Sequence, residues 1–129
     1  MILVDTSVWI DFFQTPESDT ATTLSSLIRG HNRVGLCGIV LQEILQGIKE
    51  RKSYELVRER LLKFPFIETN RETWLLAASI YRDLRAKGAT LPPVDVTIGA
   101  LAIQHAMALF TRDEHFRTMA GSAGLRLYE

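Results

Sequence analysis

Short apolar runs alternate with helical segments along most of this chain, and this order limits what it can fold into. Five such runs are expected to be strands, at residues 2–4, 34–37, 64–67, 108–111 and 125–127. Parallel neighbours in a sheet need a crossover between them, usually a helix. The alternation therefore predicts an α/β fold, with a central, mostly parallel sheet flanked by helices. Pro65 lacks a backbone donor, so the third strand belongs at an edge of that sheet.

Helix-start and helix-stop residues bound the segments between the strands. Asp19 is expected to cap a helix that Gly30 ends. Thr69 and Glu72 fit the capping box of a helix that ends at Gly88. Further helices are expected at residues 6–13, 39–48, 53–62, 95–107 and 113–119.

Length and composition exclude several classes of protein. The chain has 129 residues, and two domains would each be too small to bury a good core, so we expect a single domain over residues 1–129. Lys+Arg and Asp+Glu both number 15, which excludes a basic field over the whole molecule and leaves only local basic patches. Cys37 has no cysteine partner, and no apolar stretch reaches the roughly 18 residues of a membrane span. We therefore expect a cytoplasmic protein without a membrane anchor.

Three acidic residues stand alone in long stretches that otherwise carry no formal charge. Asp5 is the only charged side chain in residues 1–10, Glu43 the only one in 34–48, and Asp95 the only one in 88–111. Burying an unpaired carboxylate costs several kcal/mol. Each acid therefore needs a compensating partner, which is a basic side chain, a set of backbone donors or a metal ion.

The positions of these acids, together with Asp113, point to one edge of the sheet. Asp5 and Asp113 each follow a strand, Asp95 precedes a helix, and Glu43 lies at the border of the apolar face of a helix. Ligands of open parallel sheets bind beyond the carboxyl ends of the strands. Two carboxylates about 4 Å apart repel by roughly 4 kcal/mol, which a divalent cation with oxygen ligands would offset. Without convergence, Asp95 and Asp113 are helix caps and Glu43 reaches solvent at a rim.

Five segments carry a resemblance that extends over nearly the whole chain. They are MILVDTS at 1–7, LQEILQG at 41–47, DVTIGALA at 95–102, TRDEHF at 111–116 and GLRL at 124–127. In order and spacing they resemble a PIN-domain ribonuclease, specifically the VapC-type toxin of bacterial toxin–antitoxin pairs. Gly99 stands where this family usually has alanine, and we expect it to soften that helix slightly.

The resemblance implies an endoribonuclease toxin that depends on Mg²⁺ or Mn²⁺. It assigns catalysis and metal binding to Asp5, Glu43, Asp95 and Asp113. The three aspartates would contact metal, and Glu43 would bind metal or a water that attacks in line. Cleavage would leave 5′-phosphate and 3′-hydroxyl ends. Thr6 and Ser7 either support the site through a hydroxyl or amide or only begin the first helix, the interpretation favoured for Thr6.

The resemblance also implies two protein partners. One is a cognate antitoxin of the VapB type, which would lay an apolar helix beside Trp9, Phe12 and Phe13 and direct a basic side chain at the acids. The other is a second copy of the chain, since family members usually form homodimers. For RNA, basic residues outnumber acids in 49–63, and Arg112 and Arg117 flank Asp113 as candidate phosphate contacts.

Three other interpretations stay open at this point. A receiver domain also clusters acids at strand ends, but it needs a late lysine, and no lysine follows Lys87. A metal-free ribonuclease would use a histidine base, for which His115 is better placed than His31 or His105 because it lies two residues past Asp113. A catalytically inert interaction module could keep the same fold, and only a cleavage assay separates it from an enzyme.

Overall fold

A four-stranded, fully parallel sheet forms the centre of the molecule in the computed structural model, which describes residues 1–129. Its strands are β1 (Ile2–Val4), β2 (Val34–Cys37), β3 (Phe66–Ile67) and β4 (Ala108–Phe110). The strand order is β3-β2-β1-β4, and every pairing is parallel. The first strand therefore lies between the second and the last. The predicted α/β class and the edge position of the third strand are both confirmed, but β3 begins only after Pro65 and is shorter than the predicted 64–67.

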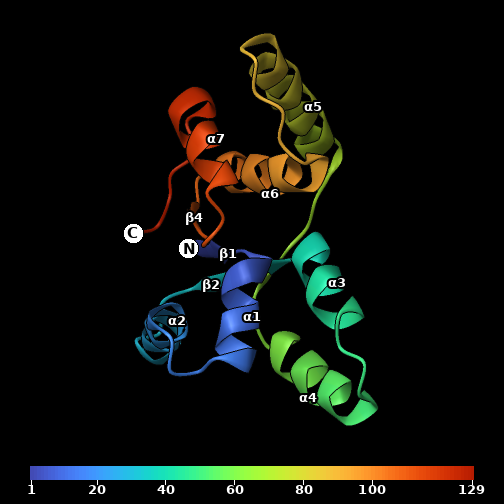
Figure 1. Cartoon of the computed structure of the whole chain (residues 1–129), viewed down its shortest axis with the longest axis vertical. Coiled ribbons are helices and arrows are strands. Elements are labelled where there is room, and N and C mark those ends of the chain that lie inside the picture. The colour runs from blue at the N-terminus through green and yellow to red at the C-terminus, as the bar shows by residue number, and fades with distance from the viewer.

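Helices cover both faces of this sheet. They are α1 (Thr6–Gln14), α2 (Asp19–Arg29), α3 (Gly38–Gln46), α4 (Arg51–Leu61), α5 (Arg71–Ala86), α6 (Pro93–Gln104) and α7 (His115–Ala123). In Figure 1, α1 to α4 lie below the strands and α5 to α7 lie above them. Helices α5 and α6 pack together, as do α1 and α2, and α3 packs on α1 and α4. None of the helices combines the length and the hydropathy that crossing a bilayer requires.

Helix α6 is the most deeply buried helix of the fold. Residues 96–102 are all buried, so this helix is apolar on every side rather than amphipathic. Gly99 does more there than soften the helix, because a Cβ at this position would lie 2.3 Å from Met119 Cε and 2.7 Å from its Sδ. The missing side chain lets fully buried Met119 of α7 pack directly against α6.

Several element boundaries differ from the sequence prediction. Residues 125–127 form only an isolated bridge, between Leu109 and Leu127, because the last segment touches the sheet at one point. Ser18 rather than Asp19 caps α2, since its hydroxyl accepts from the Ala21 amide at 3.1 Å and Asp19 already lies in the first turn.

The start of α5 was also predicted one residue early. Its capping box is made by Asn70 and Thr73, not by Thr69 and Glu72, because the Asn70 side chain and the Thr73 hydroxyl each bond the other residue's amide. Helix α6 begins at Pro93, which suits a first helical position because it has no amide hydrogen to satisfy. Asp95 therefore lies inside the first turn instead of preceding the helix.

Candidate active site

Asp5 is the most buried acid of the chain, at 5% exposure. It directly follows β1 and is the N-cap residue of α1. Its Oδ2 accepts hydrogen bonds from the Thr111 hydroxyl at 2.8 Å and from the Ser7 hydroxyl at 3.1 Å. Burial raises the pKa of Asp5 above its ordinary value, the bonds from Thr111, the Thr6 amide and Ser7 lower it, and the charge of Asp95 raises it further. The site therefore holds a carboxylate at a place where ionisation is costly.

Asp95 faces Asp5 from the first turn of α6. Desolvation is the main reason that the pKa of Asp95 is raised, and the negative charges of Asp113 and Glu43 raise it further. The only basic side chain that opposes this is His115, whose Nδ1 lies 3.1 Å from Asp95 Oδ2. Asp95 makes no capping hydrogen bond to its own helix, so capping does not explain its presence.

Asp113 lies in the loop between β4 and α7. Its backbone amide donates to the Thr111 hydroxyl at 2.9 Å, and its Oδ1 accepts from the His115 amide at 3.0 Å. Asp113 thus does help to start α7, as the capping interpretation expects. The same Oδ1 also lies 3.2 Å from His115 Nδ1. Ligand atoms of Asp95, Asp113 and His115 lie within 4.8 Å of one another.

Glu43 approaches the cluster from the middle of α3. Its Oε1 accepts from the Thr6 hydroxyl at 2.7 Å, so α1 holds the carboxylate in place. Thr6 is the first residue of α1, but the favoured interpretation that it only begins this helix is wrong, because its hydroxyl also holds Glu43. Glu43 and Asp5 lie outside the group that Asp95 forms with Asp113 and His115, but Glu43 is close enough to raise the pKa of Asp95.

The predicted acids therefore meet at the carboxyl ends of β1 and β4, brought there by four separate segments. The nearby arginines do not neutralise them, because Arg112 pairs with Asp11 at 2.7 Å and Arg117 pairs with Glu114 at 2.9 Å. Four carboxylates with one imidazole are a donor set that fits a divalent cation with hard, mostly oxygen ligands. Both arginines are at least half exposed.

Two contributions to the site were not predicted from the sequence. Thr111 links Asp5 to the Asp113 loop, and its place at the end of a predicted buried strand is the clue that the sequence offers. The sequence indicates His115 only as a candidate base, whereas the structure places its Nδ1 beside two acids. His31 and His105 lie far from this edge in the topology, because they precede β2 and β4 and so sit at the amino ends of the strands.

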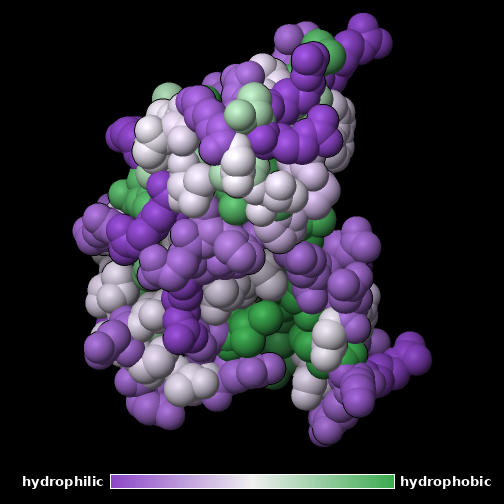
Figure 2. All heavy atoms as spheres, turned by 45° about the horizontal axis from the view of Figure 1, so that its top comes forward, coloured by the Kyte–Doolittle hydropathy of each residue, from purple (hydrophilic) through white to green (hydrophobic).

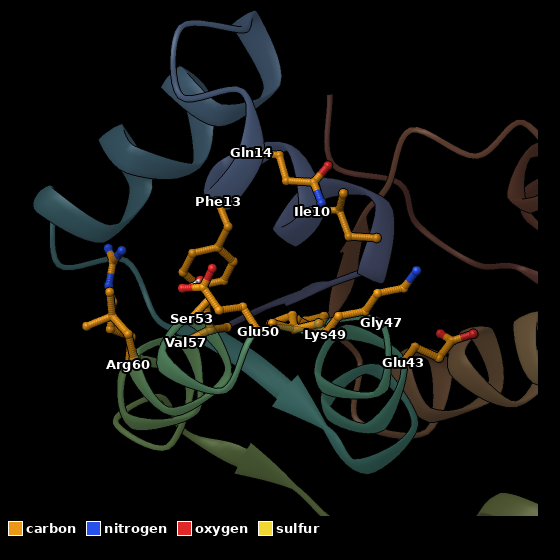
Figure 3. A pocket seen from close by; sticks show the side chains of 13 residues that line it. Ile10, Phe13, Gln14, Glu43, Gly47, Lys49, Glu50, Ser53, Val57 and Arg60 are labelled. Carbon is orange, nitrogen blue, oxygen red and sulfur yellow. Dashed lines mark hydrogen bonds between the residues drawn. The ribbon is translucent and has the colours of Figure 1, made fainter.

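A groove of about 550 Å³, which Glu43 helps to line, lies between α1, α3 and α4. Figure 2 shows hydrophobic residues gathered in a hollow in the lower half of the molecule, where Figure 1 places these helices. The apolar lining residues are Ile10, Phe13, Ile44, Ile48, Leu56 and Val57. In Figure 3, Glu43 and Arg60 lie at opposite ends of the groove. Trp9 contributes to the core beneath it, since it is fully buried.

Residues 2–122 match the family model described as PIN domain. The chain belongs to the PIN-domain family. Curated relatives of this PIN domain include VapC ribonuclease Mb1587 of Mycobacterium bovis, which is 30% identical and aligns over 98% of this chain and 96% of its own length. Ribonuclease VapC32 of Mycobacterium tuberculosis is 28% identical, with 100% and 98% of the two chains aligned.

Solved structures of low sequence identity share the fold of this PIN domain. The structure of FitAcB from Neisseria gonorrhoeae superposes with a TM-score of 0.80 at 23% identity, covering 100% of this chain and 97% of that one. The structure of VapBC2 from Rickettsia felis, bound to a DNA fragment from its promoter, superposes with a TM-score of 0.83 at 20% identity, covering 99% and 98%.

Proposed function

We propose that this PIN domain is an endoribonuclease toxin of the VapC type, inhibited by a cognate antitoxin and acting in the cytoplasm on RNA. Asp5, Glu43, Asp95 and Asp113 would form its catalytic centre and hold Mg²⁺ or Mn²⁺. The observation that carries the proposal is the convergence of these acids at one sheet edge with no arginine or lysine to balance them. Relatives named as VapC ribonucleases, aligned over almost their full length, support the same activity.

A bound divalent cation would supply an activated water near neutral pH and would offset charge on the phosphodiester. Residues of the chain hold the acids in the orientations that both roles of the cation require. Thr111 and Ser7 hold Asp5 in one orientation through hydrogen bonds of 2.8 and 3.1 Å. Thr6 fixes Glu43 at the mouth of the groove, where its free carboxylate oxygen is placed to orient a water and accept its proton. The hydroxyl groups of Thr6, Ser7 and Thr111 therefore set the orientations of Asp5 and Glu43.

Antitoxin binding is proposed for the groove between α1, α3 and α4. Six of its thirteen lining residues are hydrophobic and would receive the apolar face of an amphipathic helix, and charged residues such as Glu43 and Arg60 also line it. Glu43 lies in the lining and also belongs to the acid cluster, so a basic side chain leaving the bound helix at that end would meet the acids directly. The homodimer implied by the resemblance is proposed as well, and sedimentation velocity of the purified chain would test it.

Cleavage of a single-stranded RNA by the purified chain tests the proposed activity. We expect cleavage that requires Mg²⁺ or Mn²⁺, stops in EDTA, and is lost in Asp5→Asn and in Asp95→Asn. Asp83→Asn, which removes an exposed carboxylate of α5, is the matched control and should cleave normally. Full cleavage in EDTA, or unchanged cleavage by both site variants, would overturn the proposal.

The remaining alternative is an inert PIN-fold module that only binds its partner. It predicts a folded chain that binds antitoxin and cleaves no RNA with either metal. Full retention of the four acids favours the enzyme, because an inert module would gain stability by losing some of these mutually repelling charges.

A further inference from the structure

His115 occupies a position among the acids that a hydrogen bond explains only in part. Its Nδ1 lies 3.1 Å from Asp95 Oδ2 and 3.2 Å from Asp113 Oδ1. Nδ1 carries at most one hydrogen, so it can donate well to one of these oxygens and not to both. A single hydrogen bond therefore explains one of the two short distances from Nδ1 and leaves the other unexplained.

Metal coordination provides one. Octahedral ligands about 2.1 Å from a small divalent cation lie roughly 3 Å from their neighbours, which is the separation of Nδ1 from each oxygen. The ligand atoms of Asp95 and Asp113 also lie within 4.8 Å of each other, so all three groups can reach a single cation. Two carboxylates and one imidazole would occupy only some of the positions around such a cation and would leave others open for water and a substrate oxygen.

The backbone around His115 holds the imidazole in place before any ion binds. His115 is the first residue of α7, and its amide donates to Asp113 Oδ1 at 3.0 Å. Fully buried Phe116 and Met119 anchor the helix to the core. The side chain of His115 itself is 52% exposed, so an ion can reach Nδ1 from solvent without a rearrangement of the core.

We infer that His115 Nδ1 is a direct ligand of the cation, together with Asp95 and Asp113, and that the site consequently prefers Mn²⁺ to Mg²⁺. Imidazole nitrogen suits first-row transition metals, whereas Mg²⁺ prefers oxygen ligands throughout. This inference rests on the proposed metal-dependent function and goes beyond it, because it adds a nitrogen ligand and a preference between the two metals.

Pulsed EPR of Mn²⁺ added to the purified full chain tests the ligand directly. We expect a nitrogen coupling that changes from the ¹⁴N to the ¹⁵N pattern when histidine alone is isotopically labelled. The coupling should vanish in His115→Ala and persist in His31→Ala and His105→Ala, which are matched controls away from the acids. Bound Mn²⁺ without histidine nitrogen coupling, or coupling that survives in His115→Ala, would overturn the inference.

Metal affinities give a second, independent measurement. Titration calorimetry of wild type should show tighter binding of Mn²⁺ than of Mg²⁺. His115→Ala should weaken Mn²⁺ binding by roughly ten-fold or more, the range in which loss of even an indirect partner falls, and should weaken Mg²⁺ binding much less. Equal losses for the two metals would contradict the nitrogen ligand. His115→Asn, which keeps a short polar side chain, separates loss of the ligand from a local folding defect when circular dichroism is unchanged.

The outcomes separate this inference from the proposed function. RNA cleavage with bound Mn²⁺ but no nitrogen coupling would remove His115 as a ligand and leave the nuclease intact. Absence of both Mn²⁺ binding and RNA cleavage would overturn the nuclease proposal and the inference together.

Discussion

Two polar clusters of this molecule each include a buried polar side chain, Thr73 in one and Asp5 in the other, but they differ in charge. Between α5 and α6, Thr73 is fully buried and its hydroxyl donates to Gln104, while Asn70 Oδ1 accepts from the Thr73 amide at 3.1 Å and from Gln104 Nε2 at 3.0 Å. At the sheet edge, Asp5 and Asp95 face other carboxylates. The first cluster is neutral and complete in itself, whereas the second is left with excess negative charge.

This difference shows why buried polarity alone does not identify a functional site. A closed hydrogen-bond network stabilises the fold and needs nothing from outside. A set of like charges lowers stability unless a cation joins it. We therefore expect the stability of the protein to respond in opposite ways when the two clusters are mutated. Only the acid cluster should respond to metal and to pH.

Asp5→Asn should produce the largest effect, and on activity rather than on stability. We expect RNA cleavage to fall by at least about 100-fold, since even a small misplacement at a reacting centre costs that much. The metal-free variant should melt at the same temperature as wild type or higher, because a buried charge has gone. Cleavage rates and thermal melts of one preparation would check both, and a marked loss of stability would contradict the excess of negative charge.

Mg²⁺ or Mn²⁺ should stabilise the acid cluster and, through it, the fold. At a metal concentration 100 times the Kd, stabilisation should reach about 2.7 kcal/mol if the unfolded chain binds no metal. Thermal melts with and without metal would measure it. Asp95→Asn should lose most of the effect, and a Thr73→Val variant should keep it.

Thr73→Val should destabilise the protein by roughly 1 kcal/mol, because the fully buried Thr73 hydroxyl loses its bonds with exposed Asn70 and half-buried Gln104. Urea unfolding would measure the loss. Cleavage per folded molecule should stay at the wild-type level. A stable Thr73→Val variant would show that the neutral cluster contributes little, and this would weaken the contrast.

The smallest expected effect is a pH dependence of opposite sign to ordinary acid denaturation. The pKa values of Asp5 and Asp95 are raised above 3.8 in the folded state, so the folded chain holds protons that the unfolded chain has released. Their contribution to metal-free stability is therefore present below about pH 3.8 and is lost as pH rises through the folded pKa values.

The measurement is urea unfolding from pH 4 to 7 of wild type and of the double variant Asp5→Asn with Asp95→Asn. Relative to wild type, the double variant should become steadily more stable as pH rises. A constant difference across this range would mean that neither group has a raised pKa.

The sequence predicts the parallel sheet because its buried strands appear as short apolar runs that alternate with helical segments. It also predicts that the acids lie near one another, because each stands alone in a stretch without other charges. Cap positions were displaced by a residue at Ser18 and Asn70, because neighbouring polar residues have similar capping preferences and only the backbone decides between them. The contact of His115 with two acids required the position of α7, which packing on Gly99 determines.

The strand order has a consequence for synthesis of the protein on the ribosome. Because β4 pairs with β1, the last strand must reach the first before the acid cluster can close. A nascent chain that has emerged as far as α5 already holds Asp5 and Glu43 but lacks Asp95 and Asp113. Such a chain has two of the four site carboxylates and no complete centre, so the proposed nuclease would stay inactive until α6 and the segment after β4 have been made.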